Sequence, residues 1–318
     1  MSGVSRRFDG LQAVRDLSLD VDEGTILGLI GPSGSGKTTT IRMLTGSLAP
    51  TDGEIRVLGE DPGRFSRQTR ERIAYMPQLF SLYEDLTARE NVGFVAALYG
   101  FSWFGRGKRI RAALEVVDLW DARNRRARDL SGGMQRRLEL ACAIVHQPDV
   151  LFIDEPTAGI DPLLRRSIWN ELRSMREEGR TLLVTTQYVA EAEFCDRVAL
   201  LADGELVALD TPEALRQRVF GGEVLDIETD RAVDPEVVAR VAEVISVRQP
   251  SARRLRAVVA DAGTATPLLM QVFSDAGIGV VSLEEHQPSF DEVFADLVER
   301  RREERATTPE QDDAQRAA

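Results

Sequence analysis

The sequence predicts an α/β fold organised around a parallel β-sheet, and two observations support this prediction. Short β-branched or aliphatic runs alternate with longer helical patterns over residues 25–210, an order typical of strands connected by helices. Two of the runs, Val150–Ile153 and Thr181–Thr185, are almost wholly apolar or β-branched. Strands of a parallel sheet have this composition because helices cover both of their faces.

The same patterns place the other elements of this region. Further strands are expected at Thr25–Ile30, Glu54–Val57, Ile73–Met76, Arg197–Ala202 and Glu205–Ala208. Helices are expected at Lys37–Thr45, Ala88–Leu98, Lys108–Val117, Gly133–Val145, Pro162–Glu178 and Ala190–Cys195. Asp203 and Gly204 separate the last two strands and are a strong signal for a two-residue hairpin turn.

Two domains and a helical insertion are expected. Residues 79–140 follow a strand of the predicted sheet and are almost continuously helical in pattern, so they form a helical subdomain inserted into a first domain of residues 1–220. An accessory α+β domain over 222–302 has the order βαββαβ with a trailing helix, which resembles a ferredoxin-like unit. Its elements are Glu223–Thr229, Pro235–Val244, Ile245–Arg248, Leu255–Ala260, Ala265–Ala276, Val280–Glu284 and Ser289–Arg300. The polar residues 303–318 are expected to be disordered.

Composition narrows the partners that this chain could have. The 318 residues carry a formal net charge of −12 and a pI near 4.9. A protein that binds a phosphate backbone needs a dense positive surface, so we expect no nucleic-acid partner. No apolar run approaches the roughly 20 residues of a membrane-spanning helix, and no apolar stretch follows the N-terminal arginines as in a secretory signal. We therefore expect a cytoplasmic protein that reaches a membrane only through another protein.

A glycine-rich loop between a predicted strand and a predicted helix indicates a phosphate-binding site. The segment GPSGSGKT at residues 31–38 fits the pattern G-x-x-x-x-G-K-[ST] in the context that this motif requires. Backbone N–H groups of such a loop face inward, and the helix that follows adds its positive end. Lys37 is expected to reach the outer phosphates of a bound nucleotide, and Thr38 to ligate Mg²⁺. The expected nucleotide contacts are Gly31, Pro32, Ser33, Gly34, Ser35, Gly36, Lys37, Thr38 and Thr39.

Two carboxylates follow the apolar strand at Val150–Ile153. Mg²⁺ takes one or two carboxylates together with phosphates and water, so Asp154 is the candidate metal ligand. Glu155 would lie beside the water that attacks the γ-phosphate, where it acts as a general base or orients the water. Taken alone, such a pair is more often a strand end that faces solvent. Together with the loop at Gly31–Thr38, it indicates ATP hydrolysis.

A second anion site is predicted at the segment LSGGMQ, residues 130–135. Ser131 is a good helix N-cap, and Gly132 and Gly133 leave the start of the helix unshielded. The alternative interpretation is an ordinary capped helix. These three segments, in this order, resemble the ATP-binding subunits of ABC transporters, and LSGGMQ resembles the signature motif of that family. The resemblance covers residues 4–212 and implies an ABC-type P-loop nucleotide-binding domain.

The resemblance implies further roles. Phe8 stands where the family has an aromatic ring that stacks on adenine, and Gln78 matches the glutamine that contacts Mg²⁺ and the attacking water. Asp161 matches a loop that crosses between two subunits. In the family, ATP lies between the phosphate loop of one subunit and the signature helix of another, so a second ATP-binding subunit, identical or paralogous, is expected. The residues that would contact the partner's ATP are Ser131, Gly132, Gly133 and Gln135.

Two features differ from the common pattern of the family. Gln187 occupies the position where a histidine usually contacts the γ-phosphate; glutamine can donate a hydrogen bond there but cannot carry a positive charge. The Gln187–Tyr188 pair is similar to daunorubicin-resistance-type export ATPases, which also carry a small C-terminal domain. In the family a strand precedes the stretch equivalent to Gly3–Arg7. Here we expect either that this strand lies upstream of residue 1 or that the antiparallel edge is short.

The leading functional hypothesis is the cytoplasmic motor of an exporter. ATP would join two such subunits, and hydrolysis would drive a separate permease of the ABC-2 type that exports a drug or a hydrophobic, lipid-like compound. The protein would be held at the cytoplasmic face of the membrane by that permease. One alternative is a soluble ABC ATPase that acts on ribosomes or repair complexes. Another is an ATP-binding regulator that does not hydrolyse.

Overall fold

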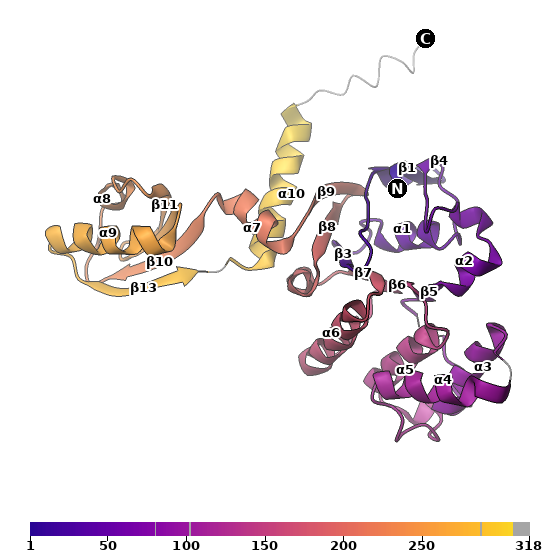
Figure 1. Cartoon of the computed structure of the whole chain (residues 1–318). Coiled ribbons are helices and arrows are strands. Elements are labelled where there is room, and N and C mark those ends of the chain that lie inside the picture. The colour runs from indigo at the N-terminus through magenta and orange to yellow at the C-terminus, as the bar shows by residue number, and fades with distance from the viewer. Residues whose placement is uncertain (80, 102, 287, 308–318) are drawn as a thin grey trace, which may run out of the picture. The chain divides into compact units, whose positions relative to one another are not determined.

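The computed structural model describes residues 1–79, 81–101, 103–286 and 288–307. The chain divides into two compact units, Met1–Asp210 and Thr211–Ala318 (Figure 1). The sequence predicted the boundary between the two domains after residue 220. The structure instead assigns α7 (Pro212–Phe220) to the second unit, where it packs on α10 (Phe290–Thr307).

A six-stranded sheet forms the centre of the first unit, with the strand order β5-β6-β7-β3-β8-β9. The first five strands of this order are parallel, and β9 is antiparallel to β8. Asp203 and Gly204 connect these two strands with φ angles of 51° and 81°, as a two-residue hairpin turn requires. The predicted parallel α/β core is confirmed. The strands are β3 (Ile26–Ile30), β5 (Ile73–Met76), β6 (Val150–Asp154), β7 (Thr181–Thr186), β8 (Arg197–Ala202) and β9 (Glu205–Asp210).

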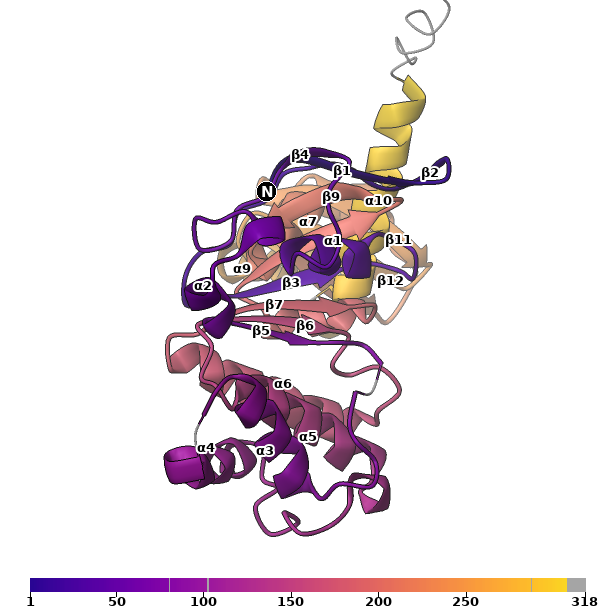
Figure 2. The same cartoon turned by 90° about the vertical axis from the view of Figure 1, so that its right-hand side faces the viewer.

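Helices cover both faces of this sheet. Helix α1 (Lys37–Leu44) lies on one side, whereas α5 (Gly132–Ile144) and α6 (Pro162–Glu177) lie on the other (Figures 1 and 2). Helix α6 begins with Pro162 in its first turn and buries the apolar stripe that includes Trp169, whose side chain is 0% exposed. The apolar strands are therefore enclosed on both faces, which explains their composition.

A small antiparallel sheet with the order β2-β1-β4 completes this unit. Its strands are β1 (Ser2–Phe8), β2 (Leu11–Leu17) and β4 (Asp52–Glu54). The sequence prediction missed β1 and β2, although the stretch Gly3–Arg7 lies within the strand Ser2–Phe8. Most side chains of β1 are partly or fully exposed and only Val4 is buried, so the apolar alternation that marks a half-buried strand is absent there.

The helical subdomain contains α3 (Ala88–Leu98), α4 (Trp103–Val116), the short 3₁₀ segment η2 (Ala127–Asp129) and α5. Helix α3 begins at a capping box in which Thr87 and Glu90 satisfy each other's backbone N–H groups. Three short elements depart from the predictions. These are the unpredicted η1 (Pro62–Arg64) and α2 (Arg67–Glu71), and the stretch η3 (Val189–Phe194), which is 3₁₀ rather than α-helical.

The second unit is built on a four-stranded antiparallel sheet with the order β11-β12-β10-β13. After α7 the elements are β10 (Glu223–Thr229), α8 (Pro235–Ala239), β11 (Val244–Ser251), β12 (Arg254–Val259), α9 (Ala262–Asp275), β13 (Val280–His286) and α10. Helix α10 continues to Thr307, so the expectation of disorder from residue 303 is wrong for residues 303–307. Residues 308–318 lie outside the described residues.

The core of the second unit offers a test of its packing. Phe273 on α9 is 0% exposed, whereas Leu268 on the same helix is 43% exposed. We expect Phe273→Ala to lower the free energy of unfolding of this unit by about 3–5 kcal/mol, since it removes buried apolar contacts and leaves a cavity. Leu268→Ala is the matched control and should cost little. Chemical denaturation of the full chain measures both; equal losses would contradict this packing.

Candidate nucleotide site

Three neighbouring strands end at the same edge of the central sheet and bring the predicted site residues together. In the parallel register, Asp154 at the end of β6 pairs with Thr185 of β7. Thr186, the next residue of β7, pairs with Ile30 at the end of β3. The loop that follows β3 therefore starts beside the carboxylates that end β6. Ligands of open α/β sheets bind at this edge.

The loop Gly31–Lys37 wraps tightly before α1. Gly36 has a φ of 97°, and a Cβ there would lie 2.6 Å from the carbonyl oxygen of Ala13. At Gly31 a Cβ would lie 2.1 Å from the carbonyl oxygen of Leu201. Glycine is needed at both positions because the loop backbone is pressed against two other strands. The result is a compact loop that opens onto the N-terminus of α1, as phosphate binding requires.

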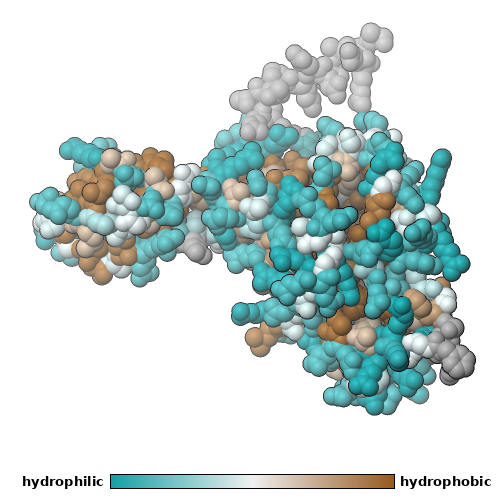
Figure 3. Space-filling view, in the orientation of Figure 1, coloured by the Kyte–Doolittle hydropathy of each residue, from teal (hydrophilic) through white to brown (hydrophobic). Residues whose placement is uncertain are grey.

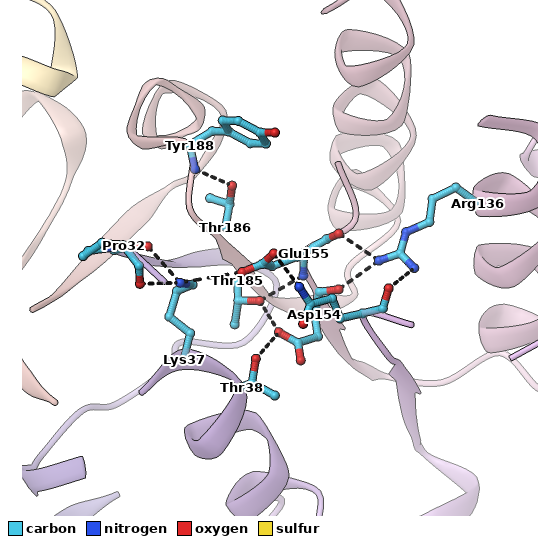
Figure 4. A network of polar contacts seen from close by, with 11 residues as sticks. Pro32, Lys37, Thr38, Arg136, Asp154, Glu155, Thr185, Thr186 and Tyr188 are labelled. Atoms are coloured by element: carbon cyan, nitrogen blue, oxygen red, sulfur yellow. Dashed lines mark hydrogen bonds and ion pairs between the residues drawn. The ribbon is translucent and has the colours of Figure 1, made fainter. Parts of the chain in front are cut away.

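The Lys37 ammonium is buried in this loop. Its Nζ donates to the carbonyl oxygens of Gly31 at 2.8 Å and Pro32 at 3.0 Å, and lies 3.7 Å from Glu155 Oε1 (Figure 4). Burial lowers the pKa of Lys37, and the nearby carboxylates of Glu155 and Asp154 oppose that shift. A cation held this close to the loop backbone is placed to meet an anion bound there.

Asp154 presents a buried carboxylate to the start of α1. Its Oδ1 accepts hydrogen bonds from Thr38 Oγ1 at 3.2 Å and from Thr185 Oγ1 at 2.5 Å. Its Oδ2 is buried and has no hydrogen-bond partner among the described residues. A buried carboxylate oxygen without a donor suits a hard cation, and a neighbouring hydroxyl is a second oxygen ligand. Thr38 and Asp154 therefore fit Mg²⁺, whereas no larger group of His, Cys, Asp and Glu is gathered in the described part of the chain.

Glu155 is held in a strained backbone conformation. Its φ of 48° lies in the left-handed region, which costs about 1 to 3 kcal/mol for a residue other than glycine. Its backbone N–H donates to Thr185 Oγ1 at 3.0 Å and to the Thr185 carbonyl at 3.1 Å. Gln78 Nε2 donates to Glu155 Oε2 at 2.9 Å. Two segments that lie far apart in the sequence thus place Gln78 and Lys37 around the carboxylate of Glu155.

The sequence prediction missed Thr185 and Arg136. Thr185 ends a run read only as a buried strand, yet its hydroxyl bridges Asp154 and Glu155. Arg136 is 4% exposed and donates to the carbonyl oxygens of Asp154 and Glu155, both at 2.9 Å. The available signal for Arg136 was a charged pair, Arg136–Arg137, inside a helix start that already carried a motif. Which of the two is buried depends on tertiary packing.

The predicted signature residues lie at the start of α5. Ser131 caps this helix by accepting a hydrogen bond from the N–H of Met134 at 3.3 Å. Gly133 is buried against α6, and a Cβ there would lie 1.9 Å from Leu164 Cδ2. The side chain of Gln135 donates to the Ala127 carbonyl at 2.9 Å. Since α1 and α5 lie on opposite sides of the sheet (Figures 1 and 2), one chain does not bring the two predicted anion sites onto one face.

Asp161, Phe8 and Gln187 make no hydrogen bond or ion pair with Lys37, Asp154 or Glu155 among the described residues. Asp161 caps α6 through hydrogen bonds from the N–H groups of Leu163 and Leu164, both at 3.0 Å. Phe8 is 39% exposed, with the Arg6 guanidinium 4.5 Å from its ring centroid. Gln187 is exposed directly after β7. Its neighbour Tyr188 is held by Thr186 Oγ1, which accepts from the Tyr188 N–H at 3.0 Å.

Comparison with known proteins identifies the family. A family model described as "ABC transporter" matches residues 14–158. Daunorubicin resistance ATP-binding protein DrrA2 of Streptomyces coeruleorubidus is 37% identical over 306 residues, which cover 94% of this chain and 94% of that protein. This chain belongs to the ATP-binding proteins of ABC transporters. The resemblance predicted from the motifs, and with it the ATPase assignment, is confirmed at the level of the family.

Other relatives match a smaller share of the chain. The Nod factor export ATP-binding protein I of Burkholderia lata is 40% identical over 225 residues, 70% of this chain and 74% of that protein. The probable multidrug ABC transporter ATP-binding protein YbhF of Escherichia coli is 39% identical over 229 residues. That alignment covers 72% of this chain but only 40% of YbhF, so the chain spans less than half the length of this relative.

Solved structures of ABC ATP-binding cassettes have the same fold. The ATP-binding subunit of an ABC transporter matches with a TM-score of 0.61 at 28% identity, over 69% of this chain and 92% of that chain. A dimeric cassette in a post-hydrolysis state, bound to ADP and Pi, matches with a TM-score of 0.60 at 28% identity, over 66% of this chain and 97% of that chain. Within the described residues, no helix of this chain is long and apolar enough to cross a membrane.

The bridge formed by Thr185 can be tested directly. We expect Thr185→Val to lower the rate of ATP hydrolysis roughly tenfold, because Asp154 loses a donor and the backbone of Glu155 loses an acceptor. The variant should also lose about 1 to 3 kcal/mol of stability. Thr185→Ser keeps the hydroxyl and is the matched control. Steady-state ATPase assays check the rate; a Thr185→Val protein as fast as the parent would refute the bridging role.

Proposed function

We propose that this chain is the ATP-binding and ATP-hydrolysing motor subunit of an ABC exporter, which drives a separate membrane permease. The observation that carries the proposal is the convergence of five predicted residues at one edge of the sheet. Lys37 and Thr38 begin α1, Asp154 ends β6 and Glu155 follows it, and Gln78 lies in the segment after β5. They meet within hydrogen-bond or ion-pair distance of one another.

The reaction follows from these positions. The triphosphate of ATP binds the N–H groups of the loop, and Lys37 exchanges its loop carbonyls for the outer phosphates. Thr38 and Asp154 would hold Mg²⁺, which would supply charge neutralisation at the phosphates. Glu155, oriented by Gln78, accepts a proton from the attacking water or holds that water in line. Gln187 follows the neighbouring strand at the same edge and donates a hydrogen bond to the γ-phosphate.

A second ATP-binding subunit, identical or paralogous, completes the site in this proposal. The start of α5 with Ser131 and Gly133 lies on the opposite side of the sheet from α1, so it serves the ATP of a partner. Asp161, whose carboxylate caps α6, lies at the crossing between the two subunits, and Phe8 stacks on adenine. The dimeric state of the structural relative bound to ADP and Pi supports this arrangement.

The permease would dock on the helical subdomain. Apolar side chains are exposed there: Leu79, Tyr83, Phe94 and Leu98. The rings of Tyr83 and Phe94 pack edge to face with centroids 4.8 Å apart, and apolar patches interrupt the hydrophilic surface in Figure 3. Exposed apolar clusters mark interaction sites. The names of the relatives, for drug resistance and Nod factor export, support an ABC-2-type permease at the cytoplasmic face of the membrane, with a drug or lipid-like cargo.

The second unit is proposed as a ferredoxin-like accessory domain. Its element order from β10 to β13 is βαββαβ, and its sheet order β11-β12-β10-β13 is the one expected when the first and third strands of such a unit pair at the centre. The alignment with DrrA2 over 94% of this chain extends across this unit. That relative's name concerns drug resistance, which favours a role in export rather than in ribosome or repair complexes.

The proposed motor activity is tested at Glu155. Glu155→Gln should keep ATP binding, lose most turnover and accumulate an ATP-bound dimer, since it retains the shape of the side chain without a basic carboxylate. Lys37→Ala should lose nucleotide binding itself. Size-exclusion chromatography with ATP and a phosphate-release assay measure these results. If the parent protein binds ATP without turnover, the non-hydrolysing regulator is the correct function instead.

The docking surface is tested at Phe94. Phe94→Asp should abolish co-purification with the permease from membranes, because it places a charge in the apolar cluster, while ATP hydrolysis by the isolated chain should stay within about twofold. Leu268→Asp, an equally exposed apolar position on α9, is the control and should co-purify normally. Co-purification that survives Phe94→Asp would place the docking surface elsewhere.

A further inference from the structure

Arg136 is a buried cation on α5 at the point where three segments of the first unit meet. Its side chain is 5% exposed, and its Nη1 lies 2.7 Å from Oε2 of Glu139, one turn further along the same helix. The side chain of Glu139 is 1% exposed. Removing a buried ion pair from water is costly, and apolar residues of similar size would often be at least as stable there. Stability alone therefore does not explain why the Arg136–Glu139 ion pair is buried here.

The guanidinium group joins two backbone segments that carry reacting side chains. On one side it donates to the carbonyl oxygens of the residues that end and follow β6: Asp154 at 2.9 Å, Glu155 at 2.9 Å and Pro156 at 3.1 Å. On the other side, Nη1 donates to the carbonyl of Pro77 at 2.9 Å. Figure 4 shows Arg136 directed at the backbone of Asp154 and Glu155. One planar group thus sets the spacing between the segment of Glu155 and the segment of Gln78.

Glu139 holds the second segment from its other end. Its Oε1 accepts a hydrogen bond from the N–H of Ser81 at 2.8 Å, three residues after Gln78. Burial raises the pKa of Glu139, while the hydrogen bonds from Ser81 and Arg136 and the charge of Arg136 oppose that shift. Gln78 therefore lies between two residues that the Arg136–Glu139 ion pair holds by their backbone. Arg136 binds Pro77, and Glu139 binds Ser81.

We propose that Arg136 and Glu139 are positioning residues for ATP hydrolysis, which hold the 2.9 Å contact between Gln78 Nε2 and Glu155 Oε2 through the backbone of both segments. This inference rests on the proposed role of Glu155 in hydrolysis. Neither side chain lies on the α1 side of the sheet, where Lys37 and the glycine-rich loop bind phosphate. Loss of the pair should consequently change turnover and not ATP affinity.

Steady-state kinetics on the full chain provide the first test. Arg136→Met should lower kcat roughly tenfold to a hundredfold, as expected when a reacting group is misplaced by about 1 Å, and leave KM for ATP within about twofold. Arg136→Lys keeps the charge but lacks the planar fork that reaches both segments, so its kcat should be intermediate. Glu139→Gln should lower kcat less than Arg136→Met because amide oxygen still accepts from Ser81.

Arg176→Met is the control for the loss of an arginine ion pair elsewhere in the first unit. Arg176 on α6 also forms an ion pair, with Asp196, but that pair lies at the amino end of β8, the opposite edge of the sheet. Its loss should lower stability without lowering kcat. An unchanged kcat in Arg136→Met, or equal kcat losses in Arg136→Met and Arg176→Met, would overturn the inference in favour of a purely structural ion pair.

Hydrogen exchange separates this inference from the proposed function. The backbone amides of the peptide containing Gln78 and Ser81 should exchange faster in Arg136→Met and Glu139→Gln, with β3 and β8 unchanged. A parent protein that binds ATP without turnover would refute the proposed function, and a turnover that Glu155→Gln does not reduce would refute the role of Glu155. Normal turnover of the parent combined with unchanged exchange around Ser81 in both variants would refute the positioning role alone.

Discussion

The parallel register of β3, β7 and β6 is the constraint on which the site depends. It pairs Ile30 with Thr186 and Asp154 with Thr185, so three loops leave the sheet at one edge. A shift of one residue between strands exchanges the faces to which side chains point. Such a shift would turn Asp154 away from α1 and Thr38. Close packing on both faces of the sheet opposes the shift, because it would exchange the side chains that pack against α1 with those that pack against α5 and α6.

Two unfavourable local features lie at this edge of the sheet. Asp154 buries an oxygen with no hydrogen-bond partner among the described residues, and Glu155 adopts a left-handed backbone conformation. An unsatisfied buried acceptor costs about 1 to 3 kcal/mol, and the backbone strain a similar amount. Local costs of this kind are characteristic of functional sites, where the surrounding fold over-determines the geometry. Here the fold does so through Thr185, which fixes both carboxylate-bearing residues from the adjacent strand.

The parts of the fold and site that sequence reasoning could find were those carried by contiguous residues. The loop at Gly31–Thr38, the carboxylates that follow β6 and the cap at Ser131 each combine spacing with a local structural context, and each lies where expected. The strand β1 was missed because Val4 is the only one of its seven residues that is buried, so the apolar alternation of a half-buried strand is absent. Gln78 was assigned only through family resemblance, since its contact with Glu155 joins segments 77 residues apart. No local sequence pattern indicates such a contact.

Arg136 shows why the remainder of the site needs the fold. Its guanidinium donates hydrogen bonds to backbone carbonyls, which carry no sequence signal. These carbonyls belong to the segment after β5 and to the end of β6. Ser131 caps its helix, so Arg136 connects the backbone of Glu155 to the helix start that would face a partner's nucleotide in the proposed dimer. In that dimer, the helix that completes one ATP site would be attached to the residues that react in the other. Two ATP sites built from such chains would be mechanically linked without any contact between their nucleotides.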